Sequence, residues 1–136
     1  MSDQYRILIV DDEEAVGSLL KEYLKPQKYV VETSLTAKEA LEKVKDKKYH
    51  IVVIDIELPE MDGIELLIAL KKYDPMTQII MMTESSTMDK ILRSLEYGAN
   101  DYMLKPFKSE DDVLVMIDYS VLKLERWRDA FIQIVQ

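Results

Sequence analysis

Four apolar runs in the sequence end in polar residues whose types suit phosphoryl chemistry. They are Asp11 and Asp12 after residues 7–10, Asp55 after residues 51–54, Thr83 after residues 79–82, and Lys105 after residues 102–104. Clustered carboxylates can hold a divalent cation, whereas an ammonium group and a hydroxyl can bind phosphoryl oxygens. These residue types therefore predict a site for a metal ion and a phosphoryl group, provided that the fold brings them together.

The elements that would carry these residues follow an alternating pattern. Apolar runs alternate with segments of helical periodicity, which is typical of an α/β fold with a parallel sheet covered on both faces. Pro26 is expected to end the first helix. The predicted strands are residues 6–10, 29–32, 50–55, 78–83 and 101–104. Because ligands of such sheets bind outside the carboxyl ends of the strands, we expect the candidate residues at one sheet edge.

Composition restricts the class of protein. The 136 residues suffice for one domain with a single core, and 48% hydrophobic with 32% charged residues is typical of a globular chain. The formal net charge of -8 argues against direct binding of nucleic acid or anionic lipid. The absence of cysteine excludes disulfides and thiolate metal sites. No apolar run approaches the roughly 18 residues of a membrane span, so we expect no membrane association and a cytoplasmic location.

The three aspartates suit Mg²⁺, which prefers oxygen ligands and binds through one or two carboxylates plus phosphate oxygens. Asp11, Asp12 and Asp55 would supply such ligands if the first and third strands are neighbours. Crowded carboxylates repel one another unless a cation is present. The alternative is that acidic residues after position 11 merely favour the positive end of the first helix. That alternative leaves Asp55 unexplained, because no helix is expected to begin there.

Phosphoryl transfer needs a nucleophile and neutralisation of charge on the moving oxygens. Asp55 could itself be the nucleophile and form an acyl phosphate. Lys105 could pair with one phosphoryl oxygen, and the Thr83 hydroxyl could donate a hydrogen bond to another. Pro106 disfavours helix at Lys105 and permits a cis bond that would aim the lysine inward. Considered alone, Lys105 could instead be an exposed, solvated lysine, and Thr83 could simply lie in the segment that leads into the next helix.

Five ordered motifs resemble the receiver domain of bacterial two-component response regulators, the CheY-like superfamily. They are residues 7–14, 51–63, 81–83, 97–102 and 105–107. The resemblance covers about residues 5–122 and implies a flavodoxin-like fold, with a single parallel five-stranded sheet in the order 2-1-3-4-5. It also implies that Asp55 accepts phosphate from a sensor histidine kinase or a histidine phosphotransfer protein.

The resemblance assigns roles to the other site residues. Asp12, Asp55 and the backbone carbonyl of Glu57 would bind Mg²⁺ directly, and Asp11 would act largely through water. Lys105 would pair with the phosphoryl group. Such a module would carry out only its own phosphorylation and dephosphorylation and would not be a metabolic enzyme.

A switch is implied as well. Thr83 and Tyr102 match the family positions that turn toward the phosphorylated site. Their movement would bias a surface made of the helix near residues 88–95, strand 101–104 and the final helix.

Two acids depart from the commonest family pattern. Glu84 stands where a small residue is usual, and Glu57 lies two residues beyond Asp55. We expect both to tune the lifetime of the phosphoryl group.

The final helix is predicted to run from about Asp111 to the end of the sequence. Its apolar residues alternate in steps of four and three, at positions 113, 117, 120, 124, 127, 131 and 134. We therefore divide the chain into a receiver domain, residues 1–122, and a helical extension, residues 123–136, which would form a homodimer or serve as a linker. The alternative is a tail folded back onto the domain.

Two other functions compete with the receiver interpretation. A haloacid dehalogenase-like phosphatase also uses an aspartyl phosphate and Mg²⁺, but it usually has its nucleophile after the first strand and needs a cap. A pseudo-receiver would not be phosphorylated, which the full set of candidate residues argues against. The sequence is equally compatible with a stand-alone receiver and with the front part of a longer regulator.

Overall fold

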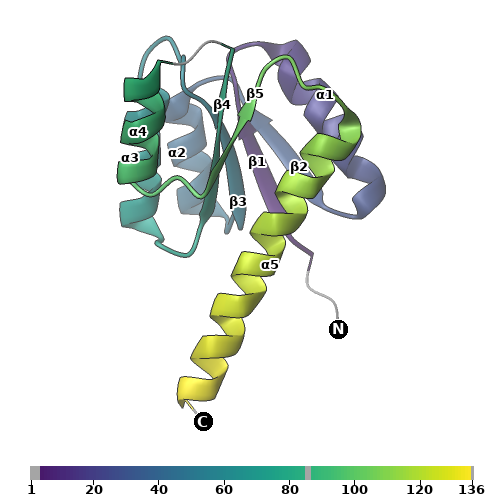
Figure 1. Cartoon of the computed structure of the whole chain (residues 1–136), viewed down its shortest axis with the longest axis vertical. Helices are drawn as coiled ribbons and strands as arrows, with labels where there is room; N and C mark the ends of the chain where they lie inside the picture. The colour runs from purple at the N-terminus through teal and green to yellow at the C-terminus, as the bar shows by residue number, and fades with distance from the viewer. Residues whose placement is uncertain (1–3, 85–86, 136) are drawn as a thin grey trace.

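The computed structural model describes residues 4–84 and 87–135. Its centre is one parallel sheet in the order β2-β1-β3-β4-β5 (Figure 1). The strands are β1 (Arg6–Val10), β2 (Val30–Ser34), β3 (Ile51–Asp55), β4 (Gln78–Thr83) and β5 (Asp101–Leu104). The helices are α1 (Glu14–Leu24), the short 3₁₀ helix η1 (Lys25–Gln27), α2 (Ala37–Asp46), α3 (Gly63–Tyr73), α4 (Met88–Glu96) and α5 (Glu110–Val135). The predicted flavodoxin-like α/β fold is confirmed.

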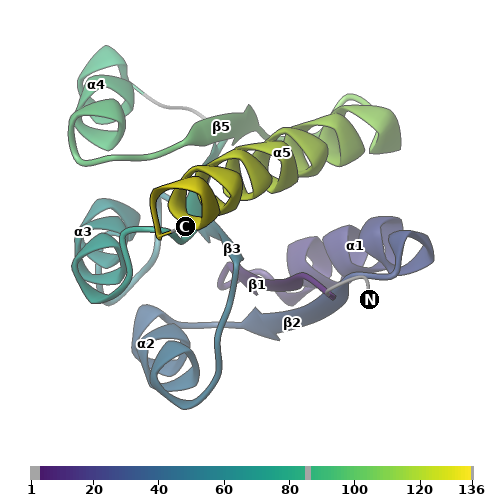
Figure 2. The same cartoon turned by 90° about the horizontal axis from the view of Figure 1, so that it is seen from below.

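The helices form two layers around the sheet. Figure 2 shows α1 and α5 on one face and α2, α3 and α4 on the other. Each face has its own apolar core. Successive residues of a strand point to opposite faces, so Ile7 and Ile9 belong to one core, and Leu8 and Val10 belong to the other. Every residue of β3 and β4 is buried, which explains why these strands read as continuous apolar runs.

The element boundaries follow local signals with two differences, one of which is that β3 begins at Ile51 and not at residue 50. Helix α1 ends at Leu24, and Pro26 lies in the 3₁₀ turn that follows, as predicted. Strand β2 covers Val30–Ser34, whereas residues 29–32 were predicted. The polar residues Thr33 and Ser34 belong to the strand because they pair with Ile9 and Val10 of β1, a pairing that apolar periodicity does not reveal.

Helix α5 is long, as predicted. It has 26 residues and therefore measures about 39 Å at the usual rise per residue. Figure 1 shows it continuing beyond the edge of the sheet where the strands begin. The stripe that faces the domain is buried as far as Leu124, whereas Trp127, Phe131 and Ile134 are exposed. The proposed division at residues 122 and 123 stays a prediction, and residues 1–3 and 136 lie outside the described residues.

Within residues 4–84 and 87–135, no helix combines the length and the apolar character that crossing a membrane requires.

Candidate functional site

The three candidate aspartates meet at the carboxyl edge of β1 and β3. These strands are neighbours, and their register pairs Val10 with Ile54, so the residues that follow lie side by side. One carboxylate oxygen from each of Asp11, Asp12 and Asp55 lies within 4.8 Å of the others. Asp11 and Asp55 are buried and Asp12 is exposed. The cluster thus opens to solvent on the side of Asp12.

Lys105 reaches into this cluster from the end of β5. Its Nζ lies 2.6 Å from Oδ2 of Asp11, 3.1 Å from Oδ2 of Asp55 and 3.6 Å from Oε1 of Glu13. The Lys105–Pro106 peptide is cis, and only 5% of the lysine side chain is exposed. Burial alone would lower the pKa of Lys105, but hydrogen bonds to Asp11 and Asp55 outweigh burial and raise the pKa. The ammonium is therefore a permanent positive charge between two acids.

Asp11 is the acid most affected by its surroundings. Burial raises the pKa of its carboxyl group, and this effect exceeds the opposing effects of Lys105 and of the Glu13 amide. The Glu13 N–H donates to Oδ1 of Asp11 at 2.8 Å. This bond fixes the side chain at the start of α1. The Lys105 ammonium and the Glu13 amide thus offset part of the effect of burial on this carboxyl group.

The backbone around Asp55 is held by several hydrogen bonds. The Glu57 N–H donates to Oδ1 of Asp55 at 2.9 Å, and the Gly63 N–H donates to the Ile56 carbonyl at 3.0 Å. A Cβ at Gly63 would lie 2.3 Å from the Asp55 carbonyl oxygen, so only glycine fits this close approach of α3 to the end of β3. The loop therefore holds the Asp55 carboxylate in one orientation.

Thr83 and Tyr102 both line a cavity of about 240 Å³, and Thr83 stands at the carboxyl end of β4, next to β3. Thr83 is buried, and its hydroxyl has no hydrogen-bond partner among the residues that the structure describes. The Tyr102 side chain lies on the outer strand β5 and is 48% exposed. Residues of α4, including Ile91 and Leu95, form another wall of the cavity. A free hydroxyl and an unfilled apolar space thus adjoin the site.

The two additional acids differ in their surroundings. Glu57 is exposed, and its Oε1 lies 2.6 Å from Nζ of Lys90 on α4. Glu84 is exposed, directly after β4. Lys90 and Glu13 were not predicted from the sequence as neighbours of the site, although they contact Glu57 and Lys105. Gly63 was identified only as the end of the motif at residues 51–63, and no local signal pairs Lys90 with a residue 33 positions earlier.

The arrangement suits a hard divalent cation. Asp11, Asp12 and Asp55 offer carboxylate oxygens, the ligands that Mg²⁺ prefers, on a cluster that is open on one side for water. The Lys105 ammonium offsets part of the negative charge on the two buried acids. The donor set therefore fits Mg²⁺.

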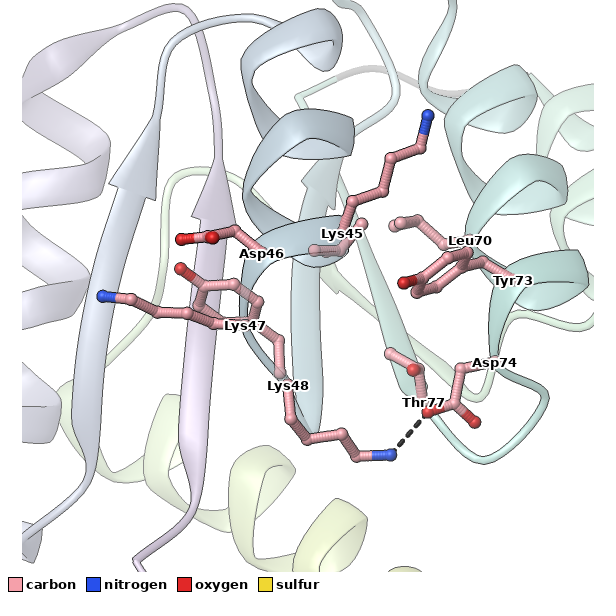
Figure 3. Close-up of a pocket in the computed structure, with 10 residues that line it drawn as sticks. Lys45, Asp46, Lys47, Lys48, Leu70, Tyr73, Asp74 and Thr77 are labelled. Carbon is pink, nitrogen blue, oxygen red and sulfur yellow. Dashed lines mark hydrogen bonds and ion pairs between the residues drawn. The ribbon is translucent and has the colours of Figure 1, made fainter.

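Another cavity of about 240 Å³ lies between α2 and α3 and contains none of the candidate residues (Figure 3). Tyr49 and Thr77 line it, just before β3 and β4, so it lies at the opposite edge of the sheet from Asp55. Its main polar contact joins Lys48 to Asp74 at 2.5 Å (Figure 3, dashed line). The chemistry-bearing residues are therefore concentrated at the carboxyl edge of the sheet.

Comparison with known proteins gives a consistent result. A model of the response regulator receiver domain matches residues 7–118. The transcriptional regulatory protein PhoP of alkaline phosphatase synthesis, from Bacillus subtilis, is 41% identical over 107 residues, which cover 78% of this chain and 44% of PhoP. The transcriptional regulatory protein SrrA of Staphylococcus aureus is 37% identical over 108 residues, 79% of this chain and 44% of SrrA. The chain thus spans less than half of the length of these relatives.

A solved structure agrees in fold over nearly its whole length. The response regulator receiver domain protein (CheY-like) from Methanospirillum hungatei superposes with a TM-score of 0.87 at 35% identity, covering 91% of this chain and 98% of that one.

Proposed function

Because the chain belongs to the response regulator receiver domain family, we propose that Asp55 accepts a phosphoryl group from a phosphohistidine on a sensor kinase or a phosphotransfer protein. One observation supports this assignment above the others. The buried ammonium of Lys105 lies 3.1 Å from Oδ2 of Asp55, where it can follow and neutralise an incoming phosphoryl oxygen.

In the proposed reaction, a carboxylate oxygen of Asp55 forms the new O–P bond while the N–P bond of the phosphohistidine breaks. The imidazole leaves with the electron pair of that bond. Glu57 orients Asp55 through its N–H, and Lys105 shifts from the carboxylates toward the transferred oxygens. Mg²⁺ bound by Asp11, Asp12, Asp55 and the Glu57 carbonyl would neutralise further negative charge on the phosphoryl group. Acyl phosphate hydrolysis would later return Asp55 to its starting form.

We propose that Thr83 and Tyr102 convert phosphorylation into a change of surface. The unpaired Thr83 hydroxyl would donate to a phosphoryl oxygen, and this movement would leave room for the Tyr102 ring in the adjoining cavity. The exposed apolar residues of α4, β5 and α5 would then present a different surface to a partner. They include Leu92, Leu95, Leu104, Val115, Tyr119 and Leu122.

We further propose that Glu57 and Glu84 tune the lifetime of the phosphoryl group. Glu57 lies two residues beyond Asp55, in the loop that follows β3, and Glu84 directly follows Thr83. Both carry negative charge beside a site that would gain a phosphoryl dianion, so each would repel anionic phosphodonors. Replacing both by Ala and Asn, respectively, is expected to change the decay rate of phospho-Asp55, and an unchanged rate would contradict this role.

The end of α5 is proposed to pair with a second copy of this chain. Trp127, Phe131 and Ile134 continue the stripe that packs on the domain, but they lie past its edge and are exposed. The Trp127 and Phe131 rings lie 6.3 Å apart on one side of the helix. Because the curated relatives are longer than this chain, a linker to a further domain is the competing role for the same stripe. A cytoplasmic location stays a prediction.

The phosphoacceptor role is tested by incubating the protein with acetyl phosphate and Mg²⁺ and measuring intact mass. Wild type is expected to gain one phosphoryl group, whereas Asp55→Asn should gain none. Equal labelling of both would overturn the assignment. A generic phosphate ester distinguishes the dehalogenase-like hydrolase, because sustained turnover would indicate that enzyme and one labelling per chain indicates a receiver.

A further inference from the structure

Lys90 on α4 forms an ion pair that reaches the loop beside Asp55. Its Nζ lies 2.6 Å from Oε1 of Glu57, and the side chains are 33% and 51% exposed, respectively. The hydrogen bond to Glu57 is the main reason that the pKa of Lys90 is raised, and the nearby charge of Asp62 adds to it. The ammonium is therefore fully charged and faces the acidic side of the site.

Glu57 connects this ion pair to Asp55. Its side chain binds Lys90, and its backbone N–H donates to Oδ1 of Asp55 at 2.9 Å. Any change in the position of the Glu57 side chain therefore acts on the residue whose amide orients Asp55. The path from α4 to Asp55 consists of two short, polar contacts.

Helix α4 has few other attachments to the domain. Ser94 is its only fully buried residue within the described part of the helix, and Met88, Leu92 and Leu95 are exposed. The cavity of about 240 Å³ beside Thr83 lies under the same helix. A helix that packs so loosely depends more than α3 does on individual polar contacts. The Lys90–Glu57 ion pair is one such contact, and it lies on the side of the helix nearest Asp55.

We propose that Lys90 is a positioning residue that acts on the Asp55 site through Glu57. It neutralises the Glu57 carboxylate beside the cluster of three aspartates, and it ties α4 to the loop that holds Asp55. The expected effect on labelling rests on the proposed phosphorylation of Asp55, whereas the effects on Mg²⁺ binding and on the attachment of α4 do not.

Removal of the lysine charge has opposite effects on the two ligands of the site. An unpaired Glu57 carboxylate would attract Mg²⁺ more strongly and would repel an anionic phosphodonor. One exposed unit charge a few ångströms away changes a binding constant by about threefold in water. Because the ion pair is exposed, it contributes little to global stability, and the variants are expected to fold.

The test is a double-mutant cycle of Lys90→Gln, Glu57→Gln and the double variant, with Arg93→Gln on the same helix as the matched control. Isothermal calorimetry measures Mg²⁺ binding, and the rate of labelling by acetyl phosphate measures access of the donor. Lys90→Gln should tighten Mg²⁺ binding and slow labelling, each by about threefold. Neither effect should occur when Glu57 is already Gln.

A second measurement tests whether the Lys90–Glu57 ion pair holds α4 against the loop that follows β3. A lysine in the first turn opposes the helix dipole, so its removal alone would stabilise α4. If the ion pair holds the helix, Lys90→Gln should instead speed hydrogen exchange of α4 amides by about two- to fivefold, but not when Glu57 is already Gln.

The proposal is overturned if Lys90→Gln acts equally in both Glu57 backgrounds, if Arg93→Gln reproduces its effects on Mg²⁺ binding and labelling, or if neither Mg²⁺ binding nor exchange changes. Absence of Mg²⁺ binding in wild type would overturn the charge effect as well. A failure of the proposed function looks different, because Asp55 would stay unlabelled while the Mg²⁺ and exchange cycles still report on Lys90.

Discussion

The ammonium of Lys105 lies 2.6 Å from Oδ2 of Asp11, closer than the 3.1 Å that separates it from Oδ2 of Asp55. The lysine is thus shared between a proposed phosphoacceptor and an acid of the proposed cation site. All three side chains are at most 6% exposed, so their charges depend on one another more than on solvent.

Replacing Lys105 by Met should therefore destabilise the metal-free protein. Two buried carboxylates would lose their cation, and breaking a buried pair from one side costs about 3 kcal/mol. Urea unfolding in EDTA measures this loss, and Mg²⁺ should recover a large part of it by neutralising the same acids. The exposed Lys108 gives the control, since Lys108→Met should change little in either condition. An equal loss with and without Mg²⁺ would contradict the shared-charge interpretation.

Gly63→Ala should disturb the loop that carries Asp55. The added Cβ would lie 2.3 Å from the Asp55 carbonyl oxygen and 2.7 Å from Cα of Ile56, both of them backbone atoms. Overpacking of this kind costs about 3 kcal/mol, and we expect labelling of Asp55 to slow as well. Gly17→Ala is the matched control, because its Cβ meets only the Thr33 side chain, at 3.1 Å, and gains helix propensity. Similar unfolding free energies for the two variants would disprove the close-approach argument.

Thr83→Val should have opposite effects on stability and on switching. Its buried hydroxyl has no partner among the described residues, so its removal should raise the unfolding free energy of the unphosphorylated protein by about 1 kcal/mol. Loss of a hydrogen bond to the phosphoryl group should weaken the response to phosphorylation by about tenfold. Hydrogen exchange of β5 before and after labelling measures that response. Thr83→Ser, which keeps the hydroxyl, should respond like wild type; a full response in Thr83→Val would remove this residue from the switch.

The Lys48–Asp74 ion pair predicts a pH-dependent contribution to stability (Figure 3). Burial would raise the pKa of Asp74, but the bonds from Lys48 and from the Met76 amide outweigh it and lower the pKa below its ordinary 3.8. A lowered pKa stabilises the fold above the ordinary value, and this contribution is lost as the pH falls through the folded-state pKa.

Asp74→Ala should therefore cost about 1 kcal/mol at neutral pH, and the difference from wild type should shrink as the pH falls below the ordinary aspartate value of 3.8 and through the folded-state pKa. Thermal unfolding of wild type and Asp74→Ala from neutral to acidic pH measures this difference in stability. The exposed Asp46 lines the same cavity and supplies the control, since Asp46→Ala should leave the pH profile unchanged. A constant difference between Asp74→Ala and wild type at all pH values would show that the ion pair is not the cause.

Replacement of both Trp127 and Phe131 by Ala should abolish the proposed pairing through α5. Sedimentation equilibrium at about 50 μM is expected to show dimers of wild type and monomers of the variant, because these side chains supply the two aromatic rings of the exposed stripe. Tyr73→Ala removes an equally exposed ring on the other face of the sheet and should leave the dimer intact. Monomeric wild type at this concentration would favour the linker role.

Much of the site could be predicted from the sequence, because a parallel sheet gathers the carboxyl ends of its strands at one edge. The alternation of apolar runs and helical periodicity therefore determined both the fold and the neighbourhood of Asp11, Asp55, Thr83 and Lys105. The order of the strands in the sheet also decides which site residues are neighbours. The expectation that the strands of Asp11 and Asp55 are neighbours followed from the family motifs, and the observed order β2-β1-β3-β4-β5 agrees with it.

Only the tertiary structure decided which side chains touch. The sharing of Lys105 between two aspartates, the pairing of Lys90 with Glu57 and the burial of α5 as far as Leu124 have no local signal. Periodicity reports which face of a helix is apolar, but not how far the helix overlaps the domain. Contacts between residues far apart in the chain depend on how helices and loops pack against the sheet, to within an ångström, and that packing is a property of the whole fold.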